Sequence, residues 1–270
     1  MLVLTAYLGA AVLYVASLVA RDSERARPTA RLATALAGVG VLAHTLGLFA
    51  LVAETGRSPY STVYGALAFM AWLVVLMQLG MVGWARLYAL GAISLPVAFL
   101  MLLCALALPP ELRQLLPLLR QHTMAAHISI AILGYGAFAV AFGLAVLYLL
   151  ENRLLKARKL RGLLERLPPL RTTEELASRF AAFGHAMLSL GLIIGTVAGL
   201  REARFHFWSD PKVLPALITW GIYTAYLVLR WGIGWRGRTA SYLLVAGFVA
   251  VLVTFVGINL LFPGMHGAVR

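Results

Sequence analysis

Long apolar segments separated by short polar connections dominate this sequence. A transmembrane helix needs about 20 mainly apolar residues to cross a hydrocarbon core about 30 Å thick. Eight segments of the chain are long and apolar enough for this. The pattern therefore predicts eight transmembrane helices, over residues 1–20, 31–53, 60–83, 87–108, 121–150, 180–200, 212–234 and 239–262.

The composition supports a membrane protein and argues against an ordinary soluble domain. Of the 270 residues, 61% are hydrophobic and 12% are charged, and the mean hydropathy is +0.88. Soluble domains are about half apolar and about a quarter charged. We expect an all-α, polytopic protein that forms a single integral membrane domain over residues 1–270. Cys104 is the only cysteine and lies within the fourth predicted span, which excludes an intrachain disulfide.

The net charge of +13 is explained by topology rather than by nucleic-acid binding. If the N-terminus lies outside, the inner connections hold sixteen Lys and Arg residues and the outer ones hold seven. An excess of cations on the cytoplasmic side is the usual bias of polytopic proteins. We therefore expect both termini on the outer, periplasmic side of a bacterial cytoplasmic (inner) membrane, and no nucleic-acid partner.

The longest inner connection is a basic cytoplasmic loop over residues 151–179. Its leucines alternate with Arg and Lys, a pattern typical of an amphipathic helix on an anionic leaflet of membrane lipid. Pro168 and Pro169 are expected to end that helix, and Thr172 with Glu175 to form a capping box for the next one. The loop either only fixes the topology or also docks a cytoplasmic protein.

Histidines stand out because ionisable residues at membrane depth are costly and are usually functional. His44 lies within the second predicted span, His185 in the inner half of the sixth, and His127 near the outer end of the fifth. His206 and His266 fall on the outer side. Neutral imidazole is a good axial ligand for haem iron. The alternative is that each ring is a hydrogen-bonded side chain at a helix interface.

Several segments resemble the cytochrome c assembly family, the haem-handling membrane proteins of the CcsA, CcmC and HemX type. Residues 210–230 read DPKVLPALITWGIYTAYLVLR, and residues 234–266 read GWRGRTASYLLVAGFVAVLVTFVGINLLFPGMH. Both resemble the closing helices of that family. Earlier, the segment HTLGLFALVAETGRSPYSTVYGALAFMAW, which starts at His44, resembles its second and third helices. The segment MAAHISIAILGYGAFA resembles the helix that carries an outer histidine, here His127.

The resemblance implies haem ligands at two depths. It implies that His127 and His266 form an outer axial pair, and that His44 and His185 form a deeper, intramembrane pair. In the family, an outer Trp-rich segment supports the exposed haem edge. The corresponding cofactor contacts here are His206, Trp208 and Asp210.

This chain departs from the family pattern around that outer segment. It has one Trp before Asp210, Val213 at a position where the family has Glu, and Pro215 where it has Trp. A glutamate that the family has near Tyr64 is replaced by Gly65. These departures concern the surface that presents haem, while the histidines are retained.

The resemblance implies a protein that takes haem b in the bilayer and holds or presents it at the outer face for cytochrome c biogenesis. Its expected partners are haem, a second cytochrome c biogenesis subunit or apocytochrome c. We expect no enzymatic activity of the chain on its own. The alternative is a HemX-like regulator or scaffold that docks a cytoplasmic haem-biosynthesis enzyme through the basic loop.

Overall fold

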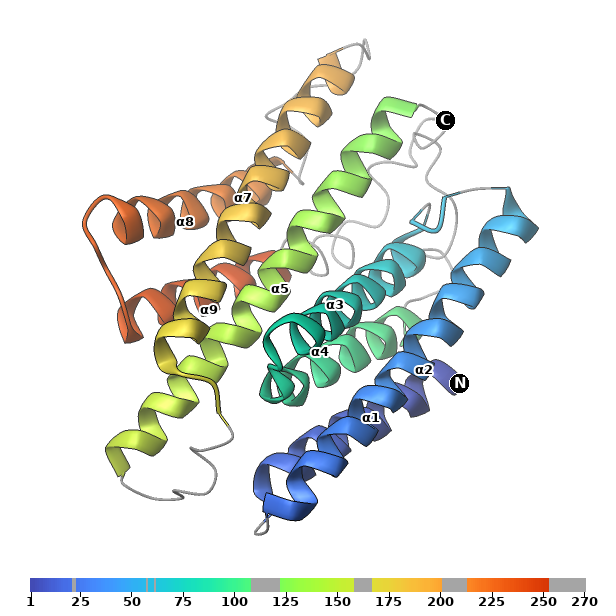
Figure 1. Cartoon of the computed structure of the whole chain (residues 1–270). Coiled ribbons are helices and arrows are strands. Elements are labelled where there is room, and N and C mark those ends of the chain that lie inside the picture. Colours follow the sequence, from blue (N-terminus) through green and yellow to red (C-terminus); the bar gives the residue numbers. More distant parts are fainter. Residues whose placement is uncertain are drawn as a thin grey trace.

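The structure is a computed structural model, and it describes residues 1–20, 23–56, 58–60, 62–107, 122–157, 167–200 and 213–252. The described residues form helices joined by short connections and contain no strand (Figure 1). The helices are α1 Leu2–Val19, α2 Ser23–Thr55, α3 Val63–Ala85, α4 Tyr88–Ala107, α5 His122–Ala157, α7 Leu170–Leu200, α8 Val213–Trp231 and α9 Arg238–Leu252.

Seven of these helices are long and apolar enough to cross a bilayer. They confirm the prediction of an all-α, polytopic membrane protein. α9 has 15 described residues, and the rest of the eighth predicted span lies outside the described part of the chain. The orientation across the membrane stays a prediction.

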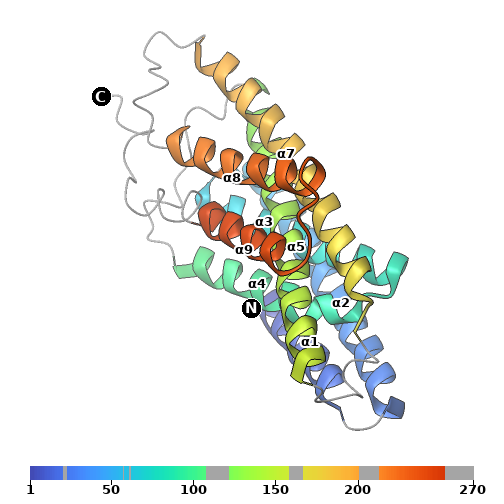
Figure 2. The ribbon, with the colours of Figure 1, turned by 90° about the vertical axis from the view of Figure 1, so that its left-hand side faces the viewer.

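α5 is the central helix of the bundle. It packs against α7 along much of its length, and also against α3, α4 and α9. α1 packs against α2 and α4 on one side of the molecule, and Figure 2 shows α8 and α9 side by side near α5 and α7. Burial follows this arrangement, since 72% of the most apolar stretch of α5 is buried but only 28% of that of α2. The peripheral helices thus present apolar faces to lipid.

Two helices begin well before their predicted spans. α2 begins at Ser23 instead of residue 31 and contains Pro28, and α7 begins at Leu170 instead of residue 180. Hydropathy detects only the lipid-soluble part of a helix, so polar helical turns beyond it are missed. His185 is the middle residue of the 31-residue α7, and its place in the inner half of the predicted membrane span 180–200 stays a prediction.

The predicted basic loop is also shorter than expected. α5 continues to Ala157, and residues 158–166 lie outside the described chain. The prediction of a capping box formed by Thr172 and Glu175 is wrong. The carbonyl of Pro169 accepts from the backbone N–H of Thr172 at 2.8 Å, so Thr172 is already inside the first turn of α7. Glu175 pairs instead with Arg171, at 2.9 Å on the exposed face.

A tight turn precedes α3. The Thr62 hydroxyl caps this helix and accepts a hydrogen bond from the backbone N–H of Gly65 at 2.9 Å. A Cβ atom at Gly65 would lie only 1.9 Å from the carbonyl oxygen of Pro59. The turn therefore excludes a side chain at this position, including the glutamate that the family pattern places nearby.

Candidate functional site

His127 lies on α5 and faces α7. Its Nδ1 atom is 2.7 Å from the carbonyl oxygen of Gly191. A carbonyl can only accept, so Nδ1 carries the proton and donates. In the neutral ring, the lone pair then lies on Nε2. A backbone carbonyl that fixes the tautomer in this way is the usual second-shell partner of a metal-ligating histidine. The contact therefore leaves Nε2 in the form that binds iron.

Glycines let the two long helices come close enough for this contact. A Cβ at Gly195 would lie 2.7 Å from the Nδ1 and Cε1 atoms of His127. A Cβ at Gly184 would lie 2.6 Å from the Phe138 ring and 2.9 Å from the carbonyl oxygen of Gly134. Small residues at such positions are typical of close helix pairs in membranes. Here the glycines leave room for the His127 ring and also allow the close contact between α5 and α7.

His44 lies on α2 and is almost completely buried, with 6% of its surface exposed. Its Nδ1 atom is 3.1 Å from the hydroxyl of Tyr7 on α1, and the two ring centres are 5.9 Å apart. Tyr7 itself approaches the backbone of α2 at Gly40, where a Cβ would lie 2.8 Å from its ring. The Tyr7 hydroxyl can donate to Nδ1 or accept from it, so this contact does not fix the tautomer. It does join α1 to α2.

His185 lies on α7 and faces α8. Its ring centre is 5.4 Å from that of Trp220, and its Nε2 atom is 3.5 Å from the hydroxyl of Thr224, which is long for a hydrogen bond. The Thr224 hydroxyl donates its only proton to the carbonyl of Trp220 at 2.9 Å. Toward His185 it can therefore only accept, and only if the ring proton is on Nε2. The Nδ1 atom is buried and has no hydrogen-bond partner among the described residues.

The structure gives the two predicted deep ligands different surroundings. His44 contacts α1 through Tyr7, whereas His185 contacts α8 through Thr224 and Trp220. The two rings share no interaction partner, so nothing described brings them together on one ligand. Within the described residues, no three His, Cys, Asp or Glu side chains gather as a metal cluster would require. Axial haem ligation needs only two histidines, so the pairing stays a prediction.

A row of aromatic side chains lies between Ser129 of α5 and Thr45 of α2. The aromatic row consists of Tyr60, Phe69 and Trp72, with ring centres 5.7 Å and then 5.4 Å apart. At one end, Ser129 on α5 donates to the Tyr60 hydroxyl at 2.6 Å. At the other end, the Trp72 indole donates to the hydroxyl of Thr45, the residue after His44, at 2.8 Å. All three rings are half-buried.

The remaining predicted site residues, His206, Trp208, Asp210 and His266, lie outside the described residues. Sequence reasoning missed the partners that hold the other histidines in place. The sequence did not point to the Gly191 carbonyl or to Tyr7, because their contacts with His127 and His44 join residues 64 and 37 positions apart. Trp220 did carry a signal, since it closes the family-like ALITW motif.

A second polar group lies at the other end of the bundle. Arg230 at the end of α8 forms a largely buried ion pair with Glu174 near the start of α7. The same Glu174 oxygen accepts from the backbone N–H of Gly237 at 2.9 Å. Glu174 therefore fixes the connection between α8 and α9 to α7. Both connections, 158–169 and 232–237, lie on the predicted inner side.

Known proteins of one family are similar to this chain. The family model described as "Cytochrome C assembly protein" matches residues 60–266. The chain is 31% identical over 236 residues to "Cytochrome c biogenesis protein CcsA" of Guillardia theta, covering 79% of this chain and 77% of that protein. It is 34% identical over 243 residues to the protein of the same name from Prochlorococcus marinus strain MIT 9303, covering 79% and 76%.

A further relative of that name, from Gloeobacter violaceus, is 29% identical over 289 residues, covering 87% of this chain and 85% of the relative. No solved structure matches the chain. The family match covers most of the helices described above, including those that carry His127 and His185. The chain is therefore a multi-pass membrane protein that belongs to the cytochrome c assembly family.

Proposed function

We propose that this protein binds haem b within the bilayer and holds or presents it at the outer face of a bacterial inner membrane for cytochrome c biogenesis. The observation that carries the proposal is the hydrogen bond from His127 to the Gly191 carbonyl, at 2.7 Å. It fixes the tautomer in which the ring proton lies on Nδ1 and the lone pair on Nε2, the form in which Nε2 can ligate iron. The relatives named as cytochrome c biogenesis proteins support the same assignment.

The other two described histidines suit the proposal to different degrees. His185 has a buried Nδ1 atom without a hydrogen-bond partner in the described part of the chain, which is unusual for a merely structural histidine. His44 already has Tyr7 as a partner. We therefore assign His127 as the main described ligand and His185 as the second candidate, with His266 as the proposed outer partner of His127. The aromatic row offers flat apolar surface beside Ser129 of α5.

The residues of this chain would bind and orient haem, while the iron porphyrin supplies any redox chemistry. His127 would bind the iron through Nε2. Gly195, which has no side chain, would leave room for the imidazole ring. The proposed partners are a second cytochrome c biogenesis subunit and apocytochrome c. With the N-terminus outside, α5 would begin and α7 would end at the periplasmic face.

An absorption spectrum of the detergent-purified protein tests the proposal. Wild type, as isolated or after hemin addition, should show a Soret band and sharp reduced α and β bands, as expected for two histidine ligands. His127→Ala should lose or shift these bands, and added imidazole should restore them because it replaces the missing ligand. A defect that is only structural would not respond to imidazole.

Ile128→Ala is the matched control, because it removes a half-buried side chain from the next position of α5 without removing a nitrogen ligand. Its spectrum should equal that of wild type. A wild-type protein that is colourless and takes up no hemin would contradict the proposal. The HemX-like regulator would then become the better assignment, and residues 151–179 should retain a cytoplasmic haem-biosynthesis enzyme in a pull-down.

A further inference from the structure

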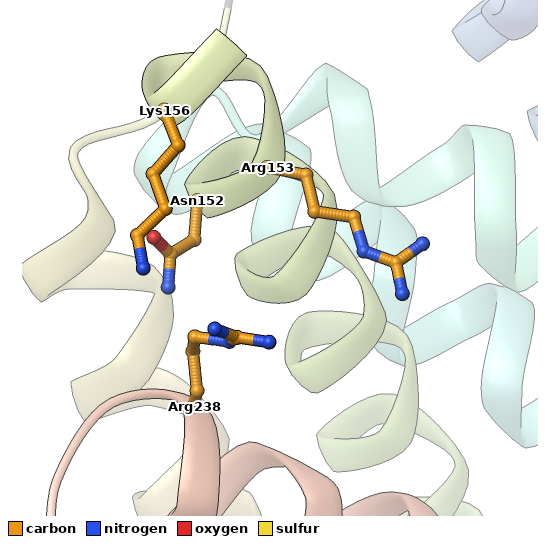
Figure 3. Close-up of a pocket in the computed structure, with 4 residues that line it drawn as sticks. All are labelled: Asn152, Arg153, Lys156 and Arg238. Carbon is orange, nitrogen blue, oxygen red and sulfur yellow. The ribbon is translucent and has the colours of Figure 1, made fainter.

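We propose that a basic pocket at the inner end of the bundle binds the phosphate group of an anionic phospholipid. The basic pocket is a cavity of about 410 Å³ lined by Asn152, Arg153 and Lys156 of α5 and by Arg238, the first residue of α9. In Figure 3, the Lys156, Asn152 and Arg238 side chains point toward one another, and Arg153 extends along the other side of α5. The proposal does not depend on haem binding.

The charges of the basic pocket are unbalanced. Three of its four lining side chains are cations and none is an acid. The ion pairs of the described residues, Arg171 with Glu175 and Arg230 with Glu174, include none of them. Lys156 and Arg238, which point toward one another, repel each other unless an anion lies between them. Their donors, together with the Asn152 amide, match the acceptor oxygens of a phosphate.

Contacts within the fold hold Arg238 in its position, so it is not a freely moving surface side chain. Gly237, which precedes it, has a positive φ of 76° and donates its N–H to Glu174 at 2.9 Å. Arg238 also reaches the hydroxyl of Tyr242 at 3.4 Å and lies 5.9 Å from the centre of that ring. Because Glu174 is bound to Arg230 as well, the start of α9 is held against the start of α7 and the end of α8, and α9 itself packs on α5.

The depth of the basic pocket in the bilayer favours lipid phosphate over a soluble anion. The end of α8 and the connection that leads into α9 expose Trp231 at 66%, Ile233 at 66% and Trp235 at 41%. Exposed tryptophans next to charged residues are typical of the membrane–water interface. The basic pocket therefore lies at the level of the lipid head groups. Basic pockets between helices on the cytoplasmic side are known to bind anionic head groups.

The test uses the full-length protein in nanodiscs of phosphatidylcholine with or without phosphatidylglycerol, and native mass spectrometry to count retained lipid. Wild type should retain phosphatidylglycerol. The double variant Lys156→Gln/Arg238→Gln should bind it about 30-fold more weakly, the effect expected from two interfacial cations. The matched control Arg25→Gln/Arg27→Gln removes two exposed cations from α2 and should bind it like wild type.

Three results would overturn the proposal. Wild type could retain no phosphatidylglycerol in preference to phosphatidylcholine, or both double variants could lose it equally, which would indicate general surface charge. Inorganic phosphate or polyglutamate could also displace the lipid and bind as tightly. In that case the basic pocket would serve a soluble phosphate or an acidic protein segment instead.

Discussion

Gly195→Ala is expected to disturb the seat of the His127 ring. The new methyl group would lie 2.7 Å from the ring atoms Nδ1 and Cε1, far inside van der Waals contact. The ring cannot move away without weakening its hydrogen bond to Gly191. Overpacking costs about 1 to 3 kcal/mol and a lost hydrogen bond about 1 kcal/mol. The free energy of unfolding should therefore fall by about 2 to 4 kcal/mol.

The assay is unfolding by SDS in mixed micelles, followed by tryptophan fluorescence. Gly221→Ala is the control, because a Cβ at Gly221 meets nothing within 4 Å. A double-mutant cycle isolates the contact. In a His127→Ala background the methyl group enters vacated space, so Gly195→Ala should cost about 1 to 3 kcal/mol less. If Gly195→Ala costs the same in both backgrounds, the His127 ring does not lie against Gly195. That result would refute the ring position from which the tautomer is inferred.

Three further substitutions test other contacts with the same unfolding assay. Gly65→Ala should lower stability by about 1 to 3 kcal/mol, because its Cβ would meet a backbone carbonyl that cannot move aside, whereas Gly80→Ala should have little effect. Arg230→Met should lower it by about 3 to 5 kcal/mol by leaving Glu174 without its ion partner, and adding Glu174→Gln should recover much of that loss. Tyr7→Phe removes the hydroxyl bound to its histidine partner and should lower stability by about 1 kcal/mol; an unchanged value would mean that this bond contributes nothing.

Most of the fold could be predicted from the apolar pattern alone. α1, α3, α4 and α8 begin and end within a few residues of their predicted spans, because their apolar stretches end where the helices end. α2 and α7 were harder to predict. Their first turns contain charged residues and are excluded from the hydrocarbon core, yet they are helical. Hydropathy reports solubility in lipid, not backbone conformation.

The candidate site was less predictable than the fold. The histidines could be chosen because ionisable residues are rare within spans, but their partners depend on which helices are neighbours. In α2 and α5, apolar residues lie on every face of the helix, so their pattern does not encode that choice. The role of Arg238 could not be predicted for the same reason. In sequence it belongs to a short connection, and only the packing of α9 on α5 makes it a wall of the basic pocket.

The lengths of the two central helices have a consequence for the shape of the protein in its membrane. α5 has 36 residues and is therefore about 54 Å long at 1.5 Å per residue. Even at a steep tilt of about 40° it would still extend about 41 Å along the bilayer normal, which exceeds a hydrocarbon core of about 30 Å. Tilting alone cannot bring the whole helix into the hydrocarbon core. About 10 Å of α5 must therefore lie outside the acyl chains, among the lipid head groups or in water.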